Sequence, residues 1–222
     1  MDHRQPIVLE PDAPADAAVI WLHGLGADGS DFVPVVESLR LPRALSVRFV
    51  FPHAPRRPVT LNGGLVMPAW YDIYSLEPGA PVDLEGIRRS AGYVHTLLER
   101  ELERGVAPER VVLAGFSQGG LVVLAAALHH DVPLAGVMAL STYLPEAVVP
   151  DEAGLQRRVF QAHGRFDEVI PLAVGRAARD RLLAQGHEVA WHEYDMAHSV
   201  CAEEVADIRA WLLRRWGLSV GT

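Results

Sequence analysis

Residues 110–120 read RVVLAGFSQGG and contain a Gly-x-Ser-x-Gly motif centred on Ser117. The apolar run Arg110 to Ala114 before the motif predicts a buried strand, and the almost wholly apolar run Gln118 to His130 predicts a buried helix. A serine between a strand and a helix, flanked by glycines, is typical of a nucleophile elbow, because the missing side chains let strand and helix approach closely. We therefore expect Ser117 to lie on a sharp turn as a nucleophile.

The rest of the chain alternates short β-rich runs with amphipathic runs, which predicts an α/β fold with a mostly parallel central sheet and helices on both faces. The other expected strands are 18–22, 47–51, 134–140, 158–162 and 188–194, with 7–10 as an antiparallel edge. Four other helices are expected. One starts at a cap of Ser30 or Asp31, and the next starts at a cap of Asp83. The third has Pro171 in its first turn and ends at Gly186, and the last starts near Ala202. We expect one domain over residues 1–222.

The charged residues exclude several function classes. All 20 basic residues are arginine and the formal net charge is −8. Without lysine there is no Walker A lysine and no Schiff-base chemistry. The arginines are scattered or paired without a basic run, so a nucleic-acid partner is not expected.

The apolar runs and the single cysteine bear on location. Cys201 has no second cysteine for an internal disulfide, and the first five residues are not followed by the apolar run of a signal peptide. The longest apolar run, Leu121 to Leu128, is far too short to span a bilayer. We expect a cytoplasmic protein without stable membrane insertion.

A serine nucleophile needs a base and a carboxylate that orients the base, and in this architecture they follow in the order Ser, Asp or Glu, His. Asp167 follows the strand that ends at Ala162, and His198 follows the strand that ends at Tyr194, so both lie where open α/β sheets place their sites. The rival carboxylate Glu168 precedes an apolar pair and should point away from Asp167. His163, beside a glycine at a strand end, is interpreted as a structural, hydrogen-bonding histidine, and His187 and His192 as surface or ladder residues of the last strand.

The loop after the first long strand predicts part of an oxyanion hole. We assign the hole to the backbone amides of Leu25 and of Gln118, the residue after the nucleophile. Residues 24–29 also match the Gly-x-Gly-x-x-Gly spacing of a dinucleotide site, but the acidic residue expected about twenty positions later is missing. No metal site is expected, because there is no Cys/His cluster and no second histidine of a zincin motif.

Residues Pro52 to Pro81 form the one long segment without clear periodicity. A loop of this length in a compact domain is usually functional or disordered. Its aromatic residues Trp70, Tyr71 and Tyr74 favour ordered packing. We therefore interpret the segment as one wall of a site.

A series of short motifs in order resembles the phospholipase/carboxylesterase family of α/β-hydrolases, with the closest similarity to small bacterial carboxylesterases. The motifs are residues 23–26, 51–55, 59–64, 67–73, 115–120, 140–145, 163–171 and 196–200. Many family members have glycine before the catalytic histidine, whereas this chain has Ala197. The resemblance implies a serine hydrolase that acts on carboxylic ester or thioester bonds. The resemblance also suggests that Trp70, Tyr143 and Val169 line the acyl pocket. The alternative interpretation of these three residues is ordinary packing in the core.

The sequence thus predicts a serine carboxylesterase with an acyl-enzyme intermediate and no cofactor, acting on small-molecule esters with short- to medium-length acyl chains. The length leaves no room for a separate lid domain, which favours a shallow, open site. Two alternatives within the enzyme class are an acyl-protein thioesterase and a lysophospholipase. A non-catalytic ligand-binding protein of the same fold is a further alternative, and a homodimer through an apolar rim stays open.

Overall fold

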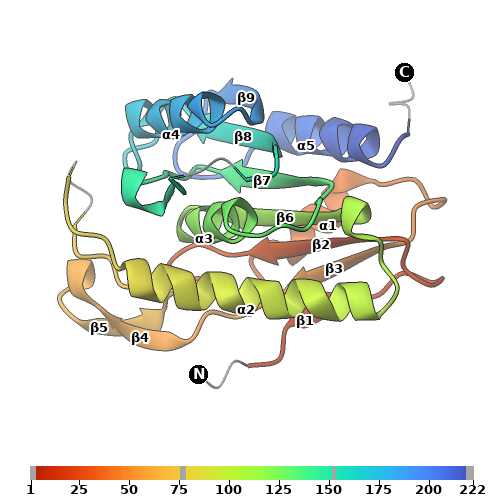
Figure 1. Cartoon of the computed structure of the whole chain (residues 1–222), viewed down its shortest axis with the longest axis horizontal. Coiled ribbons are helices and arrows are strands. Elements are labelled where there is room, and N and C mark those ends of the chain that lie inside the picture. The colour runs from red at the N-terminus through yellow and green to blue at the C-terminus, as the bar shows by residue number, and fades with distance from the viewer. Residues whose placement is uncertain (1–3, 76–78, 152–153, 219–222) are drawn as a thin grey trace.

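The computed structural model describes residues 4–75, 79–151 and 154–218. Its centre is a seven-stranded sheet in the order β1-β3-β2-β6-β7-β8-β9 (Figure 1). Its strands are β1 (Ile7–Leu9), β2 (Ala17–Leu22), β3 (Val47–Phe51), β6 (Val111–Phe116), β7 (Gly136–Leu140), β8 (Arg158–Gly164) and β9 (Glu188–Tyr194). β1 pairs with β3 in the antiparallel direction and every other pairing of this sheet is parallel, as the sequence predicts.

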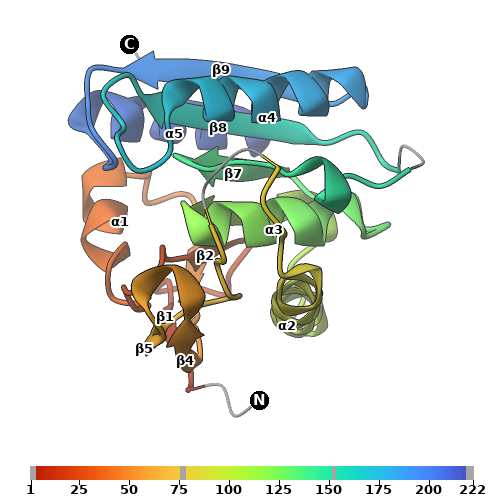
Figure 2. The same cartoon turned by 90° about the vertical axis from the view of Figure 1, so that its left-hand side faces the viewer.

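Helices cover both faces of the sheet, and each face has its own apolar core (Figure 2). One core receives side chains from α2 (Leu84–Glu103), α3 (Gln118–Leu128) and α4 (Leu172–Ala184). The other receives side chains from α1 (Val33–Leu39) and α5 (Ala202–Arg215). This arrangement confirms the predicted fold class.

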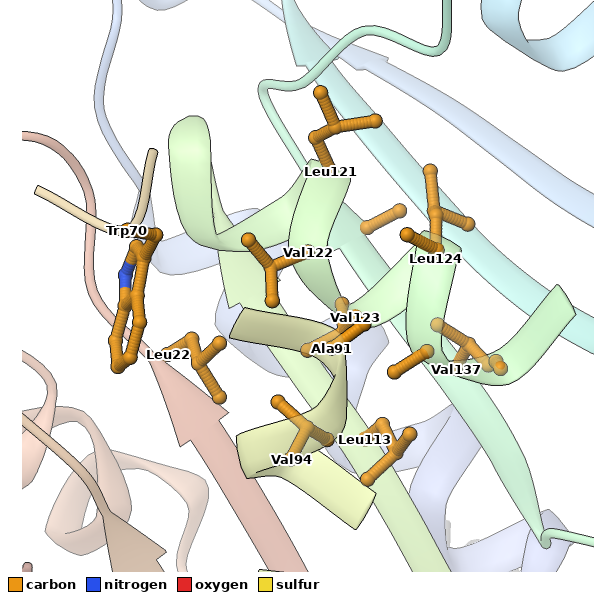
Figure 3. Packing of buried hydrophobic residues seen from close by; sticks show 14 of the residues in the cluster. Leu22, Trp70, Ala91, Val94, Leu113, Leu121, Val122, Val123, Leu124 and Val137 are labelled. Atoms are coloured by element: carbon orange, nitrogen blue, oxygen red, sulfur yellow. The ribbon is translucent and has the colours of Figure 1, made fainter. Parts of the chain in front are cut away.

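All eleven residues of α3 are buried, as the apolar run after the Gly-x-Ser-x-Gly motif predicts. Figure 3 shows side chains of α3 packed among Leu22 of β2, Val94 of α2 and Trp70. Because α3 is fixed on all sides, the turn that leads into it is also held in place.

The helix starts differ in part from the predictions. Asp83 caps α2, since its side chain accepts a hydrogen bond from the backbone N–H of Gly86. The prediction that Ser30 or Asp31 caps a helix is wrong: α1 follows Phe32 without a side-chain cap. The amide and hydroxyl of Ser30 instead bond the carboxylate of Asp28. Pro171 precedes α4 instead of lying in its first turn.

The segment from Pro52 to Pro81 is ordered where the structure describes it; residues 76–78 lie outside the described residues. It contains an antiparallel hairpin of β4 (Arg56–Val59) and β5 (Leu65–Pro68), joined through a short 3-10 turn over Thr60–Asn62. Gly63 and Gly64 carry the reversal at φ angles of +64° and +81°, which favour glycine. In the described ranges, no helix is long and apolar enough to cross a bilayer.

Candidate active site

Ser117 lies on the turn between β6 and α3 with φ 53° and ψ −117°, a backbone conformation that costs energy for any residue with a side chain. A side chain on Gly119 would place its Cβ 2.6 Å from the carbonyl oxygen of His23, and one on Gly120 would place it 2.6 Å from Cβ of Thr142. The motif glycines therefore let α3 start against the neighbouring strands. The turn is the predicted nucleophile elbow.

Three side chains from distant parts of the chain form one hydrogen-bonded row. The Ser117 hydroxyl lies 2.9 Å from Nε2 of His198, and Nδ1 of His198 lies 2.7 Å from Oδ2 of Asp167. Asp167 follows β8 and His198 follows β9, so the carboxyl ends of adjacent parallel strands bring them together. Phe116 packs against the His198 ring with 4.7 Å between ring centroids.

The Asp167 carboxylate is wholly buried, with a side-chain exposure of 0%. Burial of a charge is unfavourable unless donors compensate for the lost water. The backbone N–H groups of Val169 and Ile170 donate to Oδ1 at 2.9 and 2.8 Å, and His198 donates to Oδ2. These three donors replace the water that the carboxylate loses on burial, and the bond to Oδ2 orients the imidazole.

Leu25 and Gln118, the two residues predicted to supply the oxyanion-hole amides, line the same cavity as Ser117 and His198. Gln118 is the first residue of α3, so its N–H has no acceptor within the helix. The Leu25 loop is fastened at Gly26, whose N–H donates to the carbonyl oxygen of Pro68 at 2.9 Å. The arrangement can place two fixed donors near an oxygen that gains charge.

His23, directly after β2, holds this loop from the other side. Its Nε2 accepts the backbone N–H of Ala54 at 3.0 Å, and its Nδ1 donates to the carbonyl oxygen of Gly24. Burial lowers the pKa of His23 to about 4, so at neutral pH the ring is uncharged and Nε2 is free to accept.

The cavity around Ser117 has a volume of about 340 Å³ and adjoins a second, largely apolar cavity of about 360 Å³. The two cavities share the lining residues Ile73, Tyr143, Val169 and Ile170. The second cavity lies between α4 and the part of the 52–81 segment that follows the hairpin. Two of the predicted pocket residues, Tyr143 and Val169, line both cavities.

The third predicted pocket residue, Trp70, is not among the described residues that line either cavity. It is 1% exposed and belongs to the core beneath α2 and α3. Its indole N–H donates to the carbonyl oxygen of His23, and its backbone N–H donates to the side chain of Gln118. The prediction of a pocket role is therefore corrected: Trp70 packs in the core and links the residue after β2 to the first residue of α3.

The family model for Phospholipase/Carboxylesterase matches residues 3–214 of the chain. The chain belongs to this family. The acyl-protein thioesterase 1 of Gibberella zeae is 36% identical over 225 residues and covers 95% of each chain. That of Yarrowia lipolytica is 39% identical over 208 residues, 88% of this chain and 90% of the relative.

Solved structures of plant relatives share the α/β-hydrolase fold of this phospholipase/carboxylesterase family member. SOBER1 of Arabidopsis thaliana is 30% identical with a TM-score of 0.83, covering 90% of this chain and 99% of its own. Acyl-protein thioesterase 2 of Zea mays is 28% identical with a TM-score of 0.82, covering 95% and 98%. The curated relatives named above are fungal thioesterases, whereas the sequence suggested a closer similarity to bacterial carboxylesterases.

The rival residues weighed from the sequence have other contacts in this family member. Glu168 is exposed, whereas Asp167 is buried. His187 accepts the backbone N–H of Arg157, and His192 stacks on Phe160. In the described residues, no group of three His, Cys, Asp or Glu side chains is arranged to hold a metal ion.

The sequence predicted the 52–81 segment as one wall of a site but did not single out which of its residues line the cavities. Tyr71 lines the second cavity, and its hydroxyl is hydrogen-bonded to that of Tyr143 at 2.8 Å. Leu61 and Asn62 of the short turn after β4 line the Ser117 cavity. The Gly63-Gly64 pair between two β-rich runs is a hairpin signal that would have placed this turn.

Proposed function

We propose that the chain is a serine hydrolase whose catalytic residues are Ser117, His198 and Asp167. The observation that carries the proposal is the unbroken row from hydroxyl to imidazole to buried carboxylate, with distances of 2.9 and 2.7 Å. A serine hydroxyl is a poor nucleophile at neutral pH until a positioned base removes its proton. The family membership supports the same chemistry.

In the proposed reaction, Ser117 Oγ attacks the acyl carbonyl carbon while His198 Nε2 takes the hydroxyl proton. The amides of Leu25 and Gln118 stabilise the oxygen anion of the tetrahedral intermediate. His198 then returns the proton to the leaving group as the acyl-enzyme forms. A water molecule activated by His198 releases the acid by the same steps, and Asp167 stabilises the imidazolium throughout.

We further propose that the scissile bond is the thioester between a fatty acyl chain and a protein cysteine. This is the alternative weighed from the sequence, and it replaces the short- to medium-chain ester as the favoured substrate. Two findings support it: the fungal relatives are named acyl-protein thioesterases, and a second apolar cavity adjoins the one that holds Ser117. An acyl chain longer than the Ser117 cavity has apolar room to continue past Tyr143.

A substrate panel tests the proposal. Peptides carrying acetyl, octanoyl or palmitoyl groups on cysteine are compared with nitrophenyl esters of the same acids, with Ser117→Ala as the matched control. Each methylene that enters an apolar cavity contributes about 0.8 kcal/mol, so kcat/KM should rise about fourfold per added methylene until the cavities are full. A flat chain-length profile on the thioesters, with faster cleavage of short esters, would favour the carboxylesterase.

The location and organisation of the protein stay predictions. We propose that residues 1–222 act as one domain, which the single seven-stranded sheet supports. We also propose a cytoplasmic location, as the sequence predicts.

A further inference from the structure

His163, the penultimate residue of β8, is a second histidine close to the buried carboxylate. Its side chain is 0% exposed, and it faces α4 on the same side of the sheet as Gln161. Nε2 lies 2.8 Å from the carbonyl oxygen of Ile170 and 3.5 Å from Oδ2 of Asp167. In the described residues, Nδ1 has no hydrogen-bond partner.

These contacts determine where the ring carries its proton. Burial is the largest effect on His163 and lowers its pKa, so the ring is neutral at physiological pH and carries one proton. Nε2 faces two oxygen atoms, which only accept, whereas Nδ1 packs against Gly175. The proton therefore sits on Nε2 and is donated to Ile170 O, with its positive end also directed toward Asp167.

The backbone of Ile170 is consequently held by a hydrogen bond at its N–H and by another at its carbonyl oxygen. Its N–H donates to Oδ1 of Asp167 at 2.8 Å, and the carbonyl oxygen accepts from His163 at 2.8 Å. Ile170 also lines both cavities. The loop that supplies two of the three Asp167 donors thus depends on the His163 ring for its second attachment.

The local sequence makes room for this ring at a cost. Gly175 of α4 lies directly against it, and a Cβ at that position would collide with Nδ1. A buried nitrogen without a partner costs about 1–3 kcal/mol, so an apolar side chain would fill the space more cheaply. The free-energy cost of the unpartnered Nδ1 is explained if the site requires the Nε2–H of His163, which bonds Ile170 O and faces Asp167.

We propose that His163 is a positioning residue that holds Asp167 and the Asp167–Ile170 loop through its Nε2–H. The proposal rests on the proposed function only in that Asp167 is taken as the carboxylate that orients His198. His163 does not contact Ser117 directly; it acts through Asp167. The charged or titratable groups that face it are Asp167, His198 and Glu193.

Histidine-labelled protein followed by nuclear magnetic resonance tests the proposal without a substrate. The wild-type His163 ring should be the Nε2-protonated tautomer at neutral pH, with a bare Nδ1. In His163→Leu, the Asp167 charge loses one stabilising N–H and acts more strongly on His198, so the midpoint of the His198 titration should rise by about 0.5 pH unit. An Nδ1-protonated wild-type ring, or an unmoved His198 titration, would overturn the proposal even if the protein hydrolyses no tested substrate.

Kinetics give a second, independent readout. In His163→Leu, kcat should fall about tenfold with KM nearly unchanged, and the acid limb of kcat/KM should move to higher pH. His163→Gln, which can place an amide N–H near the same point, should recover most of kcat. Gln161→Leu is the matched control: Gln161 is equally buried on the same strand and its side-chain N–H donates to Gly175 O at 3.0 Å instead of approaching the Asp167 carboxylate. If both leucine variants lose activity only in step with folded protein, the positioning role is wrong.

Discussion

Replacing Ala177 with phenylalanine tests whether the second cavity receives the acyl chain. Ala177 lines this cavity from α4, and the cavity volume is about 360 Å³. An aromatic ring takes the room of about four methylene groups, and each buried methylene contributes about 0.8 kcal/mol. We therefore expect a loss of about 3 kcal/mol for chains that reach the cavity, which is about 200-fold in kcat/KM.

The assay measures kcat/KM for a series of S-acyl peptides from butyryl to palmitoyl. Butyryl peptides should stay within about threefold of wild type, because a short chain remains beside Ser117 and does not meet the new ring. Ala184→Phe is the matched control, since Ala184 is the exposed last residue of the same helix. Equal losses for butyryl and palmitoyl peptides, or no loss for either, would refute the assignment of this cavity to the acyl chain.

Three further predictions concern stability, measured by urea unfolding. Gly119→Ala should lower the free energy of unfolding by about 3 kcal/mol, because the new Cβ would meet backbone oxygens. Gly92→Ala, on the open surface of α2, should raise the free energy of unfolding by about 1 kcal/mol. Similar effects of the two substitutions would contradict the packing at the elbow. Ser117→Gly should be about 1 kcal/mol more stable than Ser117→Ala, since glycine relieves the strained φ of 53°; the reverse order would show no strain there. Burial raises the pKa of Glu204 from 4.5 in the unfolded chain to about 8 in the folded protein. The folded state therefore has its full stability below pH 4.5 and loses part of that stability as the pH rises through 8. Glu204→Gln should therefore add about 3 kcal/mol at about pH 9 and little at about pH 4, and equal effects at both would contradict this.

Much of the fold could be predicted because the buried parallel strands consist of short runs of apolar residues. The buried strand 47–51 has the predicted bounds, and the buried strand before Ser117 differs only by a start at Val111 and an extension to Phe116. The strand 188–194 also has the predicted bounds, although it is a partly exposed edge strand. The serine, the carboxylate and the histidine could also be predicted, because each directly follows a predicted strand and they occur in the expected order along the chain. Adjacent parallel strands then bring their carboxyl ends together, which places Asp167 beside His198.

The side chains of the 52–81 segment could not be assigned in this way. An aromatic residue in a loop satisfies the same sequence pattern whether it faces the core or a cavity. Trp70 faces the core because its N–H groups find acceptors on His23 and Gln118, whereas Tyr71 reaches the cavity and bonds Tyr143. These partners lie 47 to 72 positions away in the sequence, so their positions follow from the tertiary fold.

The second cavity was missed for a similar reason. Its walls come from α4, from the loop after β7 and from the 52–81 segment, and each contributes ordinary apolar residues. The sequence length suggested a shallow, open site for short acyl chains. The cavity instead lies between elements of the same α/β unit and needs no added domain.

The central claim is that Ser117 carries the acyl group during turnover. Intact-protein and peptide mass spectrometry after brief mixing with an S-acyl peptide or a fluorophosphonate tests it most directly. We predict one adduct, on the peptide that contains Ser117, with none in Ser117→Ala and much slower labelling in His198→Gln. An adduct on another residue, or full hydrolysis by Ser117→Ala, would contradict the account.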